Sequence, residues 1–165
     1  MRRFNHPIVQ KIAALKVPKP EEIVLNHGGA LVVRGLREEH SDGDIDMSAS
    51  WENIEYLRLV LGWISVDLVV GETREGLPRT INATRDRLEN HRFDVHRWDY
   101  SPQRFKETGK GRMYLDEQIV MSEQDEETGL WVAKPELVLM TKQGSPRQKD
   151  KDDIALITIH LDQLT

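Results

Sequence analysis

The chain contains no cysteine, which excludes disulfides and thiolate metal sites. Long apolar runs are also missing, because segments such as Leu59-Val60-Leu61 and Leu68-Val69-Val70 fall far short of the roughly 20 residues of a membrane-spanning helix. The N-terminus has basic residues but no apolar segment behind them, so we expect no secretory signal. These absences predict a cytoplasmic protein without a membrane segment.

A surplus of basic residues is absent as well. The formal net charge is −5, which argues against a dedicated nucleic-acid binder because neutralising phosphates needs a basic face. A local basic groove is still possible on one group of residues near the C-terminus: Lys142, Arg147, Lys149 and Lys151.

The composition is that of a soluble globular protein, since 38% of residues are hydrophobic and 31% are charged, and a length of 165 residues fits one domain over residues 1–165. Apolar spacing predicts helices over 7–16, 30–36, 51–61, 135–142 and 150–162. Alternation predicts strands over 43–49, 63–70, 92–98, 112–121 and 129–133. Residues 22–27 fit either a helix end or a buried strand. Strands interleaved with helices predict an α/β (α+β) fold, in which helices cover a mixed β-sheet mainly on one side.

The residues that point to chemistry begin with Asp44-Ile45-Asp46. On a strand, two residues separated by one project from the same face, so these carboxylates are positioned to bind a divalent cation together while Ile45 faces the core. Mg²⁺ binds in proteins through a few carboxylates together with phosphate oxygens. The pattern therefore predicts a Mg²⁺ site on Asp44 and Asp46. Asp42 shares their face if the strand begins early, although a turn before Gly43 is the more usual place for such an acid.

A phosphate site and a third acid would complete this arrangement. Gly28-Gly29 is predicted to form a glycine turn whose backbone N–H groups approach phosphate, and Lys142 and Lys149 are candidates to neutralise a triphosphate. Asp94 is our first choice for the third carboxylate, as a base or metal ligand, and Asp67 is its rival.

Taken in order, these elements resemble the nucleotidyltransferase superfamily, whose pattern is a glycine turn, a short helix, an acid-x-acid strand and a later single acid. The chain resembles small lincosamide and aminoglycoside nucleotidyltransferases more closely, through Arg37-Glu38-Glu39-His40 and Asp94-Val95-His96. The later strand of that pattern favours Asp94 over Asp67. Residues 135–154 resemble the helical end of this group and of related toxin nucleotidyltransferases, so the resemblance spans about residues 22–157.

Two departures bear on the site. Ala30 stands where the antibiotic enzymes usually place tryptophan, which leaves the acceptor open, and the spacing from His40 would also fit the register Asp42-Gly43-Asp44. The resemblance implies Mg²⁺-dependent transfer of a nucleoside monophosphate from a nucleoside triphosphate, such as ATP, to a hydroxyl of a small molecule or of RNA. A toxin-like enzyme acting on RNA or protein and a non-catalytic nucleotide-binding module are the alternatives. A homodimer that completes the site is a further hypothesis.

Overall fold

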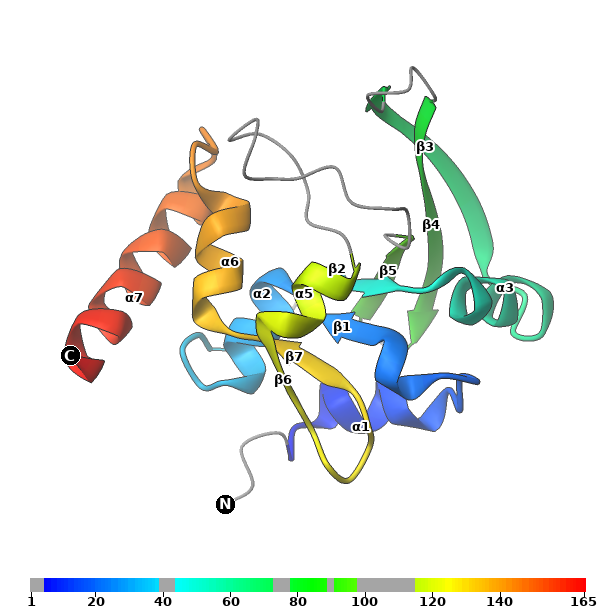
Figure 1. Cartoon of the computed structure of the whole chain (residues 1–165), viewed down its shortest axis with the longest axis horizontal. Coiled ribbons are helices and arrows are strands. Elements are labelled where there is room, and N and C mark those ends of the chain that lie inside the picture. Colours follow the sequence, from blue (N-terminus) through cyan, green and yellow to red (C-terminus); the bar gives the residue numbers. More distant parts are fainter. Residues whose placement is uncertain (1–4, 39–43, 73–77, 89–90, 98–114) are drawn as a thin grey trace.

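The computed structural model describes residues 5–38, 44–72, 78–88, 91–97 and 115–165 (Figure 1). Within residues 65–72, 78–88 and 91–97 it describes the backbone, together with the side chains of Phe93 and Val95. The helices are α1 (Pro7–Ala14), α2 (His27–Val33), α3 (Trp51–Leu59), α5 (Leu115–Val120), α6 (Pro135–Lys142) and α7 (Gln148–Leu164), with a short 3-10 turn, η1 (Pro20–Glu22). The strands are β1 (Ile23–Leu25), β2 (Asp44–Ala49), β3 (Ile64–Glu72), β4 (Pro78–Leu88), β5 (His91–Arg97), β6 (Ser122–Gln124) and β7 (Trp131–Ala133).

All of these strands belong to one sheet, in the order β3-β4-β5-β2-β1-β7-β6. Pairing is parallel between β2 and β5 and between β1 and β7, and antiparallel at the other junctions. The predicted mixed sheet of an α+β fold is therefore confirmed. Residues 22–27, for which the sequence fitted either a helix end or a buried strand, contain the strand β1.

The two faces of the sheet differ in character at its centre. Ile45 and Met47 of β2 are buried, and their register partners on β5, Phe93 and Val95, are buried with them. The α2 backbone packs closely on this face, and Trp63 places its ring 6.1 Å from that of Phe93. The same strand presents alternate polar residues to the opposite face, which is where the candidate site lies.

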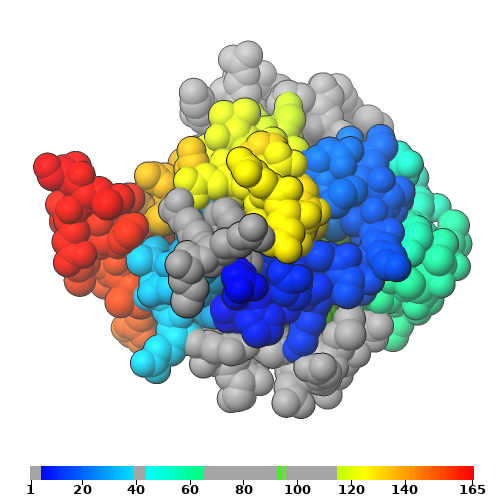
Figure 2. Space-filling model, turned by 90° about the horizontal axis from the view of Figure 1, so that it is seen from below, coloured from blue at the N-terminus to red at the C-terminus, as the bar shows by residue number. Residues whose placement is uncertain are grey.

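Helix α7 is the most peripheral element. It packs beside α6, and Figure 2 shows its C-terminal part, in red, projecting beyond the body of the molecule. Ile159 and Leu164 near that end are largely exposed. Helices α6 and α7 both occur where apolar spacing predicted them, and α6 matches its predicted bounds.

One predicted strand is wrong, and one long observed strand has no predicted counterpart. The strand expected over 112–121 is instead helix α5 from Leu115 to Val120, because Leu115, Gln118 and Ile119 turn inward at helical spacing; residues 112–114 lie outside the described residues. The strand β4 was not predicted, since residues 78–88 carry few apolar side chains and give almost no alternating signal.

Some predicted helix boundaries also shift. Helix α3 ends at Leu59, two residues before its predicted end at residue 61, and Val60 and Leu61 are exposed. Gly62, which follows them, adopts a positive φ of 70°. Helix α2 begins three residues earlier than the predicted start at residue 30. The glycine pair therefore lies inside its first turn and not in a turn before it.

Arg34 joins the end of α2 to the β6–β7 hairpin. Its side chain is only 2% exposed, and its guanidinium donates to the carbonyl oxygens of Ala133 and Val132 and pairs with Glu123 at 2.7 Å. A planar guanidinium makes these bonds simultaneously because its N–H groups point in fixed, divergent directions.

We expect Arg34→Lys to lower the free energy of unfolding by about 2 kcal/mol, because an ammonium keeps the charge but cannot reach all three acceptors. Urea unfolding followed by circular dichroism measures this loss. The control is Arg58→Lys, since Arg58, which lies over the Trp51 ring, makes one i,i+3 pair with Glu55 and that pair is only half-buried. Equal stabilities of the two variants would contradict the assignment of Arg34 as a structural anchor.

Candidate functional site

The two predicted acids lie where β2 meets the end of β1. Strands β1 and β2 are antiparallel, with Leu25 opposite Met47, so the beginning of β2 lies beside the chain as it leaves β1 for α2. The Asn26 N–H donates to the carbonyl oxygen of Asp46 at 2.9 Å, which extends the pairing to the first residue after β1. The start of α2 therefore lies next to the beginning of β2.

The burial pattern along β2 agrees with the predicted alternation. Asp44 and Asp46 are half-buried, whereas Ile45 between them is fully buried in the core. The carboxylates thus share the face opposite the one covered by α2. Two hard oxygen donors on one face fit the coordination chemistry of Mg²⁺.

The backbone also brings Asp94 to this position. Strand β5 runs parallel to β2, and Asp94 is the register partner of Asp46. Asp67, the rival, belongs to β3, and both β4 and β5 lie between β3 and β2. Sheet topology therefore makes Asp94 the neighbour of the acid pair and removes Asp67 from it. Asp42 lies outside the described residues.

The two glycines differ in what surrounds them. Gly29 is buried, and a Cβ at this position would lie 3.1 Å from Leu25 Cδ1 and 3.8 Å from Ile45 Cγ2. Gly29 therefore permits close packing of α2 on the sheet. Gly28 is half-buried. The residue before it, His27, adopts a φ of 50°, a conformation that is uncommon for a residue with a side chain and that concentrates at functional sites.

A buried polar triad flanks the acid pair. Asn26 Nδ2 donates to Ser48 Oγ at 2.9 Å and to Gln118 Oε1 at 2.6 Å. Ser48 follows Asp44 and Asp46 on the same face of β2, and Gln118 comes from α5. Sequence reasoning missed this triad, although the two-residue spacing of Ser48 from Asp46 was visible. The partner on α5 was hidden, because that segment was read as a strand.

The predicted lysines are in contrasting environments. Lys149 is exposed at the start of α7. Lys142 is 5% exposed and pairs with Asp150 at 2.6 Å and with Asp153 at 2.8 Å, so its charge is already balanced by two carboxylates. A triphosphate could reach Lys142 only by displacing one of them.

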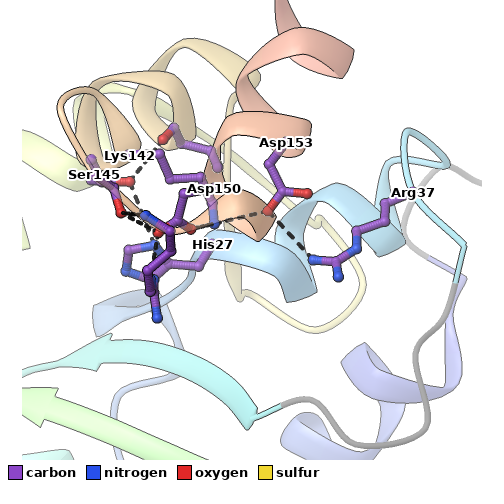
Figure 3. A network of polar contacts seen from close by, with 9 residues as sticks. His27, Arg37, Lys142, Ser145, Asp150 and Asp153 are labelled. Carbon is purple, nitrogen blue, oxygen red and sulfur yellow. Dashed lines mark hydrogen bonds and ion pairs between the residues drawn. The ribbon is translucent and has the colours of Figure 1, made fainter.

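These ions belong to a larger network that joins α2, α6 and α7 (Figure 3). Asp153 also pairs with Arg37 at 3.4 Å, and Asp150 accepts hydrogen bonds from Ser145 and Arg147, each at 2.6 Å. The neighbour of Lys142, Thr141, places its hydroxyl 3.5 Å from His27 Nδ1. The network thus reaches the beginning of α2, next to the acid pair.

The electrostatics of Asp150 reflect this network. Burial by itself would raise the pKa of the Asp150 carboxyl, but hydrogen bonds from Lys142, Ser145 and Arg147, together with the charge of Lys142, outweigh burial and hold that pKa well below its usual value. The folded protein therefore stabilises the carboxylate form of Asp150.

Comparison of the chain with protein-family models and with curated proteins finds no match. Within the described side chains, no group of three or more histidine, aspartate or glutamate residues is arranged to bind a metal ion, and the side chain of Asp94 is not among those searched. No helix in the described part of the chain has the length and apolarity needed to cross a membrane.

The lowered pKa of Asp150 predicts how stability depends on pH. The stabilisation from its carboxylate is complete above its unfolded pKa of about 4 and is lost as pH falls toward the lower pKa of the folded protein. Asp150→Asn should cost about 3 kcal/mol at pH 7, because it leaves buried Lys142 with one carboxylate fewer, and this cost should shrink progressively below pH 4.

Urea unfolding of the wild type and Asp150→Asn between pH 7 and pH 2.5 measures the difference. The matched control is Asp162→Asn on the exposed end of the same helix, for which we expect no pH-dependent difference of this size. A stability gap for Asp150→Asn that stays constant to pH 2.5 would contradict the prediction.

Proposed function

We propose that this protein is a metal-dependent nucleotidyltransferase that transfers a nucleoside monophosphate from a nucleoside triphosphate to an acceptor hydroxyl. The observation that carries the proposal is the backbone register that places Asp94 beside Asp46, which shares one sheet face with Asp44. Three acids meeting on two adjacent parallel strands, next to the turn into a glycine-containing helix, fit phosphoryl-transfer chemistry.

In this proposal Asp44, Asp46 and Asp94 would bind Mg²⁺, which would supply charge neutralisation for the triphosphate and the leaving pyrophosphate. The acceptor oxygen forms a bond to the α-phosphorus as the bond from that phosphorus to the pyrophosphate oxygen breaks. Asp94 is the residue we assign to accept the hydroxyl proton. The remaining contribution of the protein is orientation and electrostatic stabilisation.

The phosphate groups would lie against the chain at Gly28, where a missing side chain permits close approach to the backbone. Gly29 serves this site indirectly, since its own missing side chain lets α2 rest on Leu25 and Ile45. Lys149 is exposed and would offer its charge directly to the triphosphate, whereas Lys142 would act by fixing the start of α7 through Asp150 and Asp153.

The acceptor is a small-molecule hydroxyl in our first version of the proposal. A toxin-like transferase would modify RNA or protein instead, and the exposed Lys149 and Lys151 at the start of α7 favour this second version. A binding module would bind the nucleotide and release no pyrophosphate. Pyrophosphate release measured with hydroxyl-bearing small molecules, RNA and proteins as acceptors separates the three.

The first test is calorimetric titration of ATP, GTP, CTP and UTP in the presence and absence of Mg²⁺. We expect at least one nucleotide to bind in a Mg²⁺-dependent manner, and the double variant Asp44→Asn with Asp46→Asn to lose that dependence because the metal loses two anionic ligands.

The control for this variant is Asp152→Asn with Asp162→Asn, which makes the same change in net charge at two exposed positions of α7. Retained Mg²⁺-dependent binding in the control would show that the loss belongs to the acid pair and not to net charge. Absence of binding by the wild type to all four nucleotides would overturn the proposed function while leaving the fold intact.

A further inference from the structure

We propose that Asn26 is the positioning residue of this site: it fixes the metal-binding strand at Asp46 and ties it to helix α5, which lies against the same face of the sheet. The inference rests on the proposed function for its consequence in metal binding. The underlying connection between β2 and α5 is a property of the fold that can be measured separately.

Asn26 contacts β2 at two points, the backbone of Asp46 and the side chain of Ser48. Its main-chain N–H donates to the Asp46 carbonyl oxygen at 2.9 Å, and its Nδ2 donates to Ser48 Oγ at 2.9 Å. Ser48 projects from the same face as Asp46, two residues further along the strand. The backbone at residue 46 and the side chain at residue 48 are therefore both fixed by one residue.

The same amide reaches the helix that covers this face. Asn26 Nδ2 donates to Gln118 Oε1 at 2.6 Å, and Leu115 at the start of α5 is buried in the core. All three members of the triad are almost completely buried: Asn26 is 7% exposed, Ser48 3% and Gln118 4%. A hydrogen bond in such surroundings is shielded from competition by water, so it restricts both elements.

Asn26 occupies the N-cap position of α2 but does not use its side chain to cap the helix. Asn26 is the N-cap residue of α2, a position where asparagine usually accepts a hydrogen bond from the helix's own N–H groups. Here its side chain makes no capping bond. The amide is directed away from α2 and toward Ser48 and Gln118, so its role lies in joining β1, β2 and α5.

Residues that orient metal-binding side chains affect metal affinity strongly, and replacing one typically lowers that affinity about 10- to 100-fold. Asn26→Leu keeps the approximate shape of the side chain but removes the amide that contacts both partners. We expect the variant to need at least about tenfold more Mg²⁺ for half-maximal binding of the nucleotide that the wild type binds. We also expect amide hydrogen exchange to become at least about tenfold faster over both residues 44–48 and α5.

A second buried asparagine provides a matched control. Asn53 is 0% exposed, and its side chain bonds to the backbone of Lys19 and Glu22, which precede β1, whereas Asn26 follows β1. Asn53→Leu should lower the melting temperature, since it leaves buried backbone groups without partners. It should leave the Mg²⁺ requirement within about twofold of the wild type.

Calorimetric titrations of Mg²⁺ with the nucleotide, together with hydrogen exchange followed by mass spectrometry, decide the proposal. An unchanged Mg²⁺ requirement in Asn26→Leu, while Asp46→Asn abolishes Mg²⁺-dependent binding, would overturn the positioning role. If the wild type binds no triphosphate, the proposed function fails, and exchange alone then decides whether Asn26 couples β2 to α5; unchanged exchange over either element overturns that coupling.

If Asn26→Leu does not fold, Gln118→Leu breaks the same hydrogen bond from the α5 side. We expect this variant to give the same two changes, namely the raised Mg²⁺ requirement and the faster exchange over residues 44–48. If amide hydrogen exchange over residues 44–48 is unchanged in a folded Gln118→Leu variant, the contact between Asn26 and Gln118 does not restrain β2. That result would also overturn the proposal.

Discussion

The antiparallel pairing of β1 with β2 is the constraint on which the candidate site depends. It brings the residue that follows β1 beside the beginning of β2, so the Asn26 N–H meets the Asp46 carbonyl oxygen. Because β2 also pairs with β5 in parallel, the same register reaches Asp94. A shift of one residue in the β1–β2 pairing would turn the acids toward the core and bring Ile45 to the polar face, which the burial of Ile45 opposes.

How much the sequence predicted depended on whether a signal was local. Helix α6 matched its predicted bounds because Pro135 marks its start and apolar residues follow at helical spacing. The acid pair was likewise visible, since alternation on one strand is a local property. Strand β4 was missed because its stability comes from pairing with β3 and β5, and few apolar side chains mark it in the sequence.

The contacts around the site could not be predicted from local sequence signals, because they connect segments that are far apart in the chain. The Asn26 amide meets Gln118 ninety-two positions later, and Arg37 meets Asp153 across an even longer separation. Lys142 was predicted from its charge as a phosphate ligand, but the sequence contained no sign that two aspartates in the first two turns of α7 would enclose it. A charged residue in a sequence is a candidate ligand for phosphate, but its burial in the folded protein determines which group neutralises its charge.

The two faces of β2 have different roles: one packs in the core under α2, and the other carries the acids of the candidate site. On the α2 side, Ile45 and Met47 pack among buried residues, and Gly29 lets the helix approach Leu25 and Ile45 closely. This packing fixes β2 without using its polar face. The opposite face can then carry Asp44 and Asp46, because both carboxylates are only half-buried there, whereas a fully enclosed core would impose a large desolvation cost on them.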